Sequence, residues 1–381
     1  MRRKNAGALP QGFREFTVPA LLTHNYFGGD VLRRINDGDM VADNKVSTCD
    51  GVPACDNSVS ACTDDALTRG DDPSVRIGVK GVSIPAYALF NRPNGVSSPL
   101  SLREVFLLGN QGPDPFFYVL RAAPLIRIKK FGSLMHHEET DRVLEAFRRL
   151  AISMPEPERN LLLAYLLGFA CHFTLDSIMH PFVYAQQYAF CDAGVKGLDR
   201  RDGSIVHGQI EADLDMMLLR QRRGEGIRNY DYTREILKVD EGVLRLLDAA
   251  YEALAHEVYA IDLPTGAFSQ SVRDMRLTIA FLYSPRGIKR KFIGRIERLL
   301  RRHSFAQAMS PRNDVGITCD FDNHEQNIWK NPFTDEVSHT SFDELYVEAL
   351  NAALDNISAL LDGKPTAIVT KGLDFEGTPC L

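Results

Sequence analysis

The sequence predicts an all-α fold, a multi-helix bundle that carries a long irregular insertion. Apolar residues recur at steps of three and four along most of the 381-residue chain, as they do in helices with one buried face. Segments in which Val, Ile and Thr alternate with polar residues are scarce, so short strands are expected only at 75–90 and 367–370. Helices are predicted at 17–36, 101–108, 114–125, 133–153, 157–180, 205–222, 229–236, 240–258, 267–283, 287–303 and 341–362.

The first helix, 17–36, is followed by a segment of different composition. Residues 38–98 are rich in Asp, Asn, Gly, Ser and Pro, which predicts a partly disordered insertion between two core helices. A second irregular stretch, 305–340, is expected to pack as a long loop before the final helix. Because no shift in composition marks a clean linker, residues 1–381 are expected to form a single helical domain.

Glycine and proline mark two boundaries between elements. Gly112 and Pro113 form a turn, from which Asp114 can open and cap the next helix. Pro181 disfavours helical geometry at the residue before it, which predicts that the helix at 157–180 ends at His180.

The composition is that of a soluble globular protein, with 44% hydrophobic and 25% charged residues. A formal net charge of −6 argues against a general nucleic-acid coat, so no stable nucleic-acid partner is expected. Residues 1–4 are basic, but no apolar run suited to a signal peptide follows, and a cytoplasmic location is expected. Seven cysteines without a CxxC pair fit a reducing compartment; Cys49, Cys55 and Cys62 cluster in the insertion, at a spacing that matches no zinc module.

The strongest functional signal is a pair of stripes with a potential metal ligand at every fourth residue: His172, Asp176 and His180, then His207, Glu211 and Asp215. On a helix each step of four returns to nearly the same face, about 6 Å further along. The first stripe lies in an apolar segment, where burying such groups is costly unless they are paired or bound to a cation. Two such stripes predict a metal-dependent enzyme.

Four other residues are candidates because they lie beside turn or helix landmarks: His24, Asp114, His136 and His137. Mixed imidazole and carboxylate ligands suit zinc in a hydrolytic site better than a closed thiolate site. A single His-x3-Asp pair is more often an ion pair than a metal site. Asp215 is expected to be a solvated carboxylate or a partner behind the ligands rather than a direct ligand.

Four segments together resemble the zinc-dependent phospholipase C family, whose metal site is shared by single-strand-specific zinc nucleases. They are Leu-Leu-Gly-Asn-Gln-Gly-Pro-Asp (107–114), Met-His-His-Glu (135–138), Gly-Phe-Ala-Cys-His-Phe-Thr-Leu-Asp-Ser-Ile-Met-His-Pro (168–181) and His-Gly-Gln-Ile-Glu (207–211). The resemblance covers about residues 18–215 and implies the all-α fold of that family.

The resemblance also implies the roles of eight residues. One zinc ion would be bound by Asp114, His136, His172 and Asp176, and a second by His180, His207 and Glu211. His24 corresponds to a ligand of a third ion, shared with Asp176. In the family an amino-terminal tryptophan completes that third site, whereas no tryptophan precedes His24 in this chain.

The implied activity is hydrolysis of a glycerophospholipid phosphodiester by a metal-activated hydroxide, with Asp114 as the base or orienter of the water. His137 would lie behind the ligands. Two alternatives remain open: a nuclease or small-molecule phosphodiesterase with the same zinc centre, and a helical zinc-binding protein without turnover.

The segment 287–303 predicts a basic amphipathic helix. In most soluble proteins such a helix is a solvated face over a core stripe. It can also lie on an anionic membrane surface, so peripheral membrane contact through 287–303 is a possible interaction besides the phosphodiester substrate.

Overall fold

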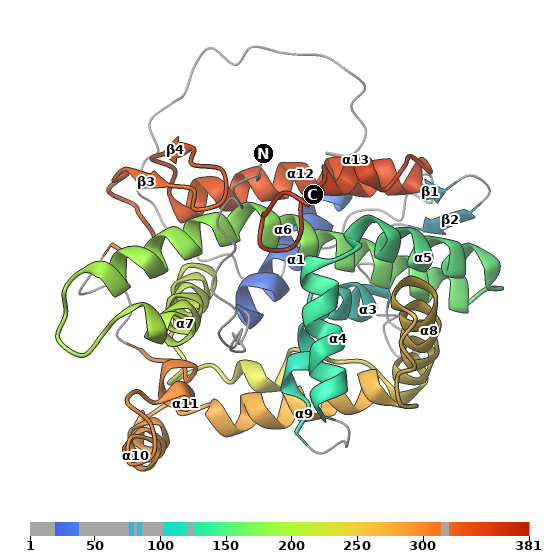
Figure 1. Cartoon of the computed structure of the whole chain (residues 1–381). Helices are drawn as coiled ribbons and strands as arrows, with labels where there is room; N and C mark the ends of the chain where they lie inside the picture. The colour runs from blue at the N-terminus through green and yellow to red at the C-terminus, as the bar shows by residue number, and fades with distance from the viewer. Residues whose placement is uncertain are drawn as a thin grey trace, which may run out of the picture.

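The computed structural model describes residues 20–37, 102–120, 125–313 and 320–380, together with the backbone of two short strands at 76–79 and 82–85. Within these ranges the chain is mostly helical, which is consistent with the predicted all-α class (Figure 1). The helices are α1 Leu21–Asn36, α3 Leu102–Gly109, α4 Leu125–His137, α5 Thr140–Ser153, α6 Glu158–Asp192, α7 Gly203–Arg223, α8 Glu241–Tyr259, α9 Ala267–Leu282, α10 Ile288–Glu297, α11 Phe305–Ala308, α12 Phe342–Leu361 and α13 Ala367–Thr370.

Short elements complete the described fold. The 3-10 helices are η1 Asp114–Tyr118, η2 Arg200–Asp202 and η3 Tyr232–Arg234. The strands expected at 75–90 form an antiparallel hairpin of β1 (Arg76–Val79) and β2 (Val82–Pro85), in which Ile77 faces Ile84 in register. A second pair, β3 (Trp329–Lys330) and β4 (Val337–Ser338), lies in the stretch that was expected to be irregular.

Helix α6 is the centre of the bundle, with α3, α5, α7 and α12 packed around it (Figure 1). It is long and apolar enough to cross a membrane by length and composition, but 94% of its most apolar window is buried inside the protein. At the crossing with α3, a Cβ on Gly168 would lie 2.0 Å from the carbonyl oxygen of Phe106, and one on Gly109 would lie 2.3 Å from that of Tyr165. The two backbones approach closely because both helices have glycine there.

An aromatic cluster fixes η1 and α4 against this core. The ring of Phe116 lies 5.1 Å from that of Phe131 and 5.0 Å from that of Tyr251, both edge to face. The hydroxyls of Tyr251 and Tyr165 are 2.7 Å apart, which links α8 to α6 by a buried hydrogen bond. These contacts hold in place the two segments that carry Asp114 and His136.

The prediction that α6 ends at His180 is wrong. The helix continues through Pro181 to Asp192, because Pro181, Phe182 and Val183 are buried and packing outweighs the local preference. The carboxyl-terminal loop lies over this part of α6, where a Cβ on Gly377 would be 2.4 Å from the carbonyl oxygen of Ser177.

Other predicted boundaries also need correction. The predicted helix 133–153 is divided between α4 and α5 at Glu139, which has a positive φ of 60°. The predicted helices at 114–125 and 229–236 shorten to η1 and η3, and the one at 287–303 ends at Glu297. The strand expected at 367–370 is a helical turn, because packing of Val369 and Thr370 into the core decides the conformation of so short a segment.

Most of the insertion at 38–98, including Cys49, Cys55 and Cys62, lies outside the described residues. Its predicted disorder and the single-domain organisation of 1–381 therefore stay predictions.

Candidate metal centre

Three of the candidate ligands lie on α6. Their spacing of four places His172, Asp176 and His180 on one face of the helix, and the apolar turns around them bury that face in the core. Oδ2 of Asp176 lies 3.0 Å from Nε2 of His172, and its Oδ1 lies 3.9 Å from Nε2 of His180. Because α6 is continuous, this stripe lies in the interior of a helix and is held rigidly.

Helix α7 supplies His207 and Glu211, one turn apart. Oε1 of Glu211 lies 3.3 Å from Nε2 of His207 and 3.6 Å from Nε2 of His180. The ring of His207 is oriented by Gln187, whose Oε1 lies 2.9 Å from Nδ1. The packing of α7 on α6 thus brings the second predicted stripe to the end of the first.

Asp114 and His136 come from η1 and the last turn of α4. Nε2 of His136 lies 3.0 Å from Oδ1 of Asp114, and Nε2 of His172 lies 3.8 Å from the same oxygen. The turn before Asp114 approaches α6 at Gly112, where φ is 49° and a Cβ would lie 2.2 Å from Cδ2 of His172. Glycine is therefore required both for the turn and for the approach to the site.

His24 lies in the first turn of α1, which Asp215 holds from α7. The Asp215 carboxylate accepts hydrogen bonds from the backbone N–H of Leu22 (3.0 Å) and of Thr23 (2.7 Å). Burial raises the pKa of Asp215 to about 6 despite these bonds. Asp215 is thus neither solvated nor a member of the ligand groups. It caps α1, and α1 carries His24, whose Nε2 lies 3.1 Å from Oδ1 of Asp176.

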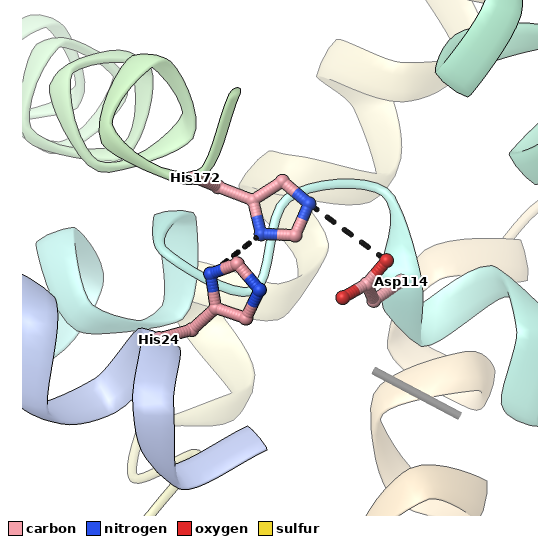
Figure 2. A group of neighbouring side chains, drawn as sticks. All are labelled: His24, Asp114 and His172. Atoms are coloured by element: carbon pink, nitrogen blue, oxygen red, sulfur yellow. Dashed lines mark hydrogen bonds and ion pairs between the residues drawn. The ribbon is translucent and has the colours of Figure 1, made fainter. Parts of the chain in front are cut away.

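All eight predicted ligands fall into three groups, in each of which the candidate ligand atoms lie within 4.8 Å of one another. The groups are His24, Asp114 and His172; His136, His172 and Asp176; and His180, His207 and Glu211. Figure 2 shows the group of His24, Asp114 and His172. All of these side chains are buried except that of His180, which is partly exposed. The described part of the chain therefore contains buried His and carboxylate clusters that could hold metal ions.

The imidazoles are oriented as metal-binding imidazoles commonly are. A backbone carbonyl that accepts a hydrogen bond from Nδ1 leaves the Nε2 lone pair free for a cation. Three rings have such a carbonyl near Nδ1: Gly132 O at 2.8 Å from His136, Asn110 O at 3.1 Å from His172, and Phe375 O at 2.8 Å from His180. Their Nε2 atoms all face carboxylate oxygens, and two electron-rich atoms face each other stably only with a proton or a cation between them.

Several buried polar atoms at this site have no hydrogen-bond partner within the described residues. They include Oδ2 of Asp114 and Oε2 of Glu211. Buried groups of this kind are normally satisfied, and a bound ion is one physical reason for the exception. The donor set therefore fits a metal centre.

Burial and opposite charge compete over the protonation of the site. Burial disfavours the charged form of His24, but the Asp176 carboxylate outweighs it, so the pKa of His24 is raised. The Asp176 carboxylate also outweighs burial at His180 and holds the pKa of His180 well above its usual range. At His136 burial is outweighed by Asp114, which raises the pKa of His136. Burial would raise the pKa of Asp176, yet the neighbouring imidazoles hold it well below its usual range.

These shifts predict that metal binding releases protons and weakens as the pH falls. Without metal, the raised pKa values of His24, His136 and His180 keep protons on nitrogens that a cation must displace. We expect the apparent affinity for Zn²⁺ to fall as the pH drops through these raised pKa values, and so to begin falling above the ordinary histidine pKa of about 6.5. Calorimetric titrations in buffers of different ionisation enthalpy measure the protons released.

The raised pKa values of these histidines also determine how the stability of the metal-free protein changes with pH. Because their folded-state pKa values are raised, their contribution to folding is present below the ordinary histidine pKa and is lost as the pH rises through the raised values. The melting temperature of chelated protein should therefore fall with rising pH, and added zinc should oppose the fall. Metal uptake without proton release would contradict both expectations.

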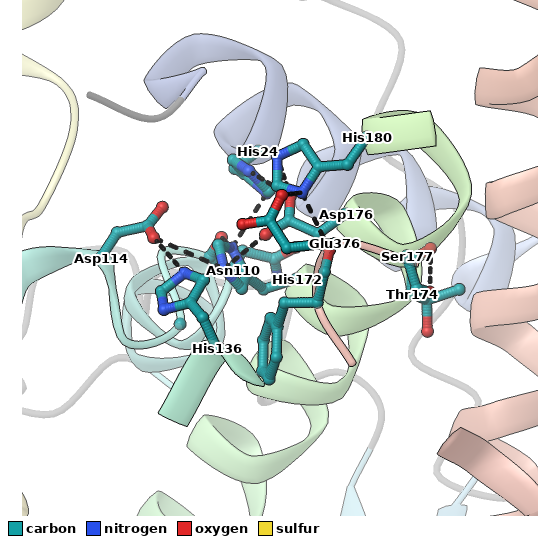
Figure 3. A network of polar contacts seen from close by, with 12 residues as sticks. His24, Asn110, Asp114, His136, His172, Thr174, Asp176, Ser177, His180 and Glu376 are labelled. Carbon is teal, nitrogen blue, oxygen red and sulfur yellow. Dashed lines mark hydrogen bonds and ion pairs between the residues drawn. The ribbon is translucent and has the colours of Figure 1, made fainter. Parts of the chain in front are cut away.

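The sequence reasoning missed a carboxylate at the carboxyl-terminal end. Oε2 of Glu376 lies 3.6 Å from Nδ1 of His180, and Figure 3 shows Glu376 beside His180 and Asp176. The loop that carries it is tied to α4, because the N–H of Phe375 donates to the carbonyl of His136 and Asp374 lies 3.3 Å from Nδ1 of His137. The sequence around Glu376 has no ligand spacing, so no local signal could have identified it.

A fourth group lies away from this centre. Asp320, Asp322 and His324 could also hold an ion, but they are partly or fully exposed, and exposed acidic groups of this kind are common without one. Comparison of the chain with protein-family models, with curated proteins and with solved structures gives no match.

Proposed function

We propose that this protein is a zinc-dependent phosphodiester hydrolase of the phospholipase C type. One observation carries the proposal: imidazoles and carboxylates from α1, η1, α4, α6 and α7 converge in the core, with Nε2 atoms directed at carboxylate oxygens. Burying so many ionisable groups is costly unless cations compensate them. A structural role for the cluster alone would be met more simply by apolar side chains.

The donor set favours zinc in a catalytic role. The groups contain nitrogen and carboxylate oxygen donors, and within the described residues none contains a cysteine. Structural zinc sites are usually closed and rich in thiolate, whereas catalytic sites use His and carboxylate ligands and leave a position for water. The neighbouring thiol of Cys171 is buried, and burial raises its pKa, so it stays protonated.

In this proposal Asp114, His136, His172 and Asp176 hold one ion, and His180, His207 and Glu211 hold a second. His24 and Asp176 offer ligands to a third. Zinc bound here would polarise the phosphoryl oxygens of a substrate and acidify water.

Asp114 is proposed to orient the attacking water and to accept its proton. Its Oδ1 lies against His136, which leaves Oδ2 without a hydrogen bond among the described residues. Because η1 and the turn at Gly112 hold the segment that carries this carboxylate, its position is fixed before substrate arrives.

The proposal of a lipid rather than a nucleotide substrate rests on the resemblance of the sequence to the phospholipase C family, not on a nearby pocket. The pocket shares α1, η1 and α7 with the cluster, and its walls are mainly aliphatic or aromatic: Leu21, Tyr118, Met216, Ile279, Leu282 and Met309. With a volume of about 40 Å³, this pocket is far smaller than the acyl part of a glycerophospholipid, so it does not decide between the two substrates.

The test combines metal content with substrate choice. Purified protein should contain two or three zinc ions per chain, release phosphorylcholine from phosphatidylcholine, lose this activity on chelation and regain it when zinc is restored. Faster cleavage of single-stranded DNA or of a small soluble phosphodiester would replace the lipid assignment and keep the zinc centre. Bound zinc without cleavage of any of these substrates would overturn the enzymatic proposal.

A further inference from the structure

Helix α10 turns apolar side chains toward solvent. The exposed fractions are 71% for Ile288, 64% for Phe292 and 49% for Ile296, which follow one another at steps of four. The turn after the helix adds Leu299 and Leu300, exposed by 81% and 86%. Soluble proteins seldom expose so many neighbouring large apolar side chains unless the surface binds something. These five residues are called the α10 apolar face below.

Polar contacts hold the opposite side of α10 against the protein. Nε of Arg290 donates to the carbonyl oxygens of Gln307 (3.0 Å) and Ser310 (3.2 Å). Oε2 of Glu297 accepts hydrogen bonds from Oγ of Ser304 (2.8 Å) and from the N–H of Ala306 (3.0 Å). The usual orientation of an amphipathic helix is therefore reversed, and the interpretation of 287–303 as a solvated face over a core stripe is wrong.

Basic side chains border the α10 apolar face. Lys291, Arg295 and Arg298 are exposed and follow one another at steps of four and three along one side of it. Glu297 is the single acidic residue of 288–302, and it faces inward. The exposed side of α10 thus combines large apolar side chains with positively charged ones.

The neighbouring helix extends the surface. Phe281 on α9 is 54% exposed, and Nζ of Lys289 lies 5.7 Å from the centre of its ring. In Figure 1 α10 lies at the edge of the molecule, away from the central helix α6. A flat surface can therefore reach α10 without displacing the core.

We propose that α10 docks the protein on an anionic lipid bilayer. In this arrangement Ile288, Phe292 and Leu299 enter the boundary between headgroups and acyl chains, and the basic side chains bind lipid phosphates. The positive border favours an anionic bilayer over a second copy of the chain, because two copies would bring their basic residues together. Docking is independent of the proposed hydrolysis, since it needs neither metal nor turnover.

Vesicle binding of the full chain tests the proposal. Cosedimentation is measured with vesicles of phosphatidylcholine alone and with vesicles of phosphatidylcholine and phosphatidylglycerol in equal parts. The unmodified protein should bind the anionic vesicles more tightly, and the difference should shrink as salt is added. Because binding rather than turnover is measured, a protein inactive on phospholipid can still support docking.

Two variants and one control separate the contributions. The variant F292Q/L299Q/L300Q should lose at least roughly ten-fold in binding to both vesicle types, because its insertion surface is gone. The variant K291Q/R295Q/R298Q should lose mainly the preference for anionic vesicles, by roughly five-fold for each removed charge. The control V347Q/I368Q removes two side chains that are 47% and 51% exposed on α12 and α13, and it should bind like the unmodified protein.

Three results would overturn the proposal. They are no binding of the unmodified protein to either vesicle, equal binding of the unmodified protein and F292Q/L299Q/L300Q, or a dimer that this variant converts to monomer in light scattering while vesicles remain unbound. The last result would identify a second copy of the chain as the occupant of the α10 apolar face.

Discussion

Asp176→Ala is expected to remove bound metal and to abolish phosphodiester hydrolysis. Asp176 is the carboxylate that joins the groups, since its oxygens lie 3.1 Å from His24, 3.0 Å from His172 and 3.9 Å from His180. Its loss would leave these imidazoles buried without their counter-charge. We expect activity to fall by more than the roughly 100-fold that marks the upper range for residues behind the ligands.

The measurements are metal content by mass spectrometry and phosphorylcholine release at saturating zinc. Ser177→Ala is the matched control, because Ser177 is the next residue on α6 and is buried, and its hydroxyl donates to the carbonyl of Thr174 in the same helix. It should keep its metal and its activity. If Asp176→Ala binds as much zinc as Ser177→Ala and stays active, Asp176 is not a ligand.

Asp176→Asn separates charge from shape at the same position. The amide keeps the size of the side chain and one oxygen, but it lacks the negative charge that raises the pKa of His24 and His180. The protons released on metal binding should therefore decrease in this variant. A purely structural role for Asp176 would leave proton release unchanged.

The placement of the α6 stripe could be predicted from the sequence because helix geometry is local. Once 158–192 is a helix, His172, Asp176 and His180 must share a face. Their convergence with Asp114 and His136 follows from no local rule, and the family resemblance supplied it. Neither helix geometry nor the family resemblance identified Glu376.

Tertiary packing explains where local rules failed. The helix passes Pro181 because its flanking side chains are buried in the core, which no property of the tripeptide around it reveals. The apolar period of α10 predicts a helix with an apolar face correctly, yet a period does not say whether that face meets the core or the solvent. That choice depends on Arg290 and Glu297, whose partners on and beside α11 the sequence does not identify.

His136→Ala is expected to reduce zinc affinity and activity far more than His137→Ala. The two residues are adjacent at the end of α4 but face different surroundings. Nε2 of His136 lies 3.0 Å from Asp114 inside the cluster, whereas Nδ1 of His137 lies 3.3 Å from Asp374 and its side chain is 24% exposed. Loss of a ligand should exceed roughly 100-fold in metal affinity, and loss of a residue behind the ligands should stay near roughly ten-fold.

Zinc affinity is measured by competition with a chelating dye, and thermal unfolding of the chelated proteins serves as the control for folding. His137→Ala should still lose some affinity, because His137 binds the loop that carries Glu376 beside His180. Glu376→Gln should then reproduce that smaller loss while both histidines remain in place. If His137→Ala is the more damaging change, the ligand at the end of α4 is His137, and the ring of His136 instead orients Asp114 through their contact.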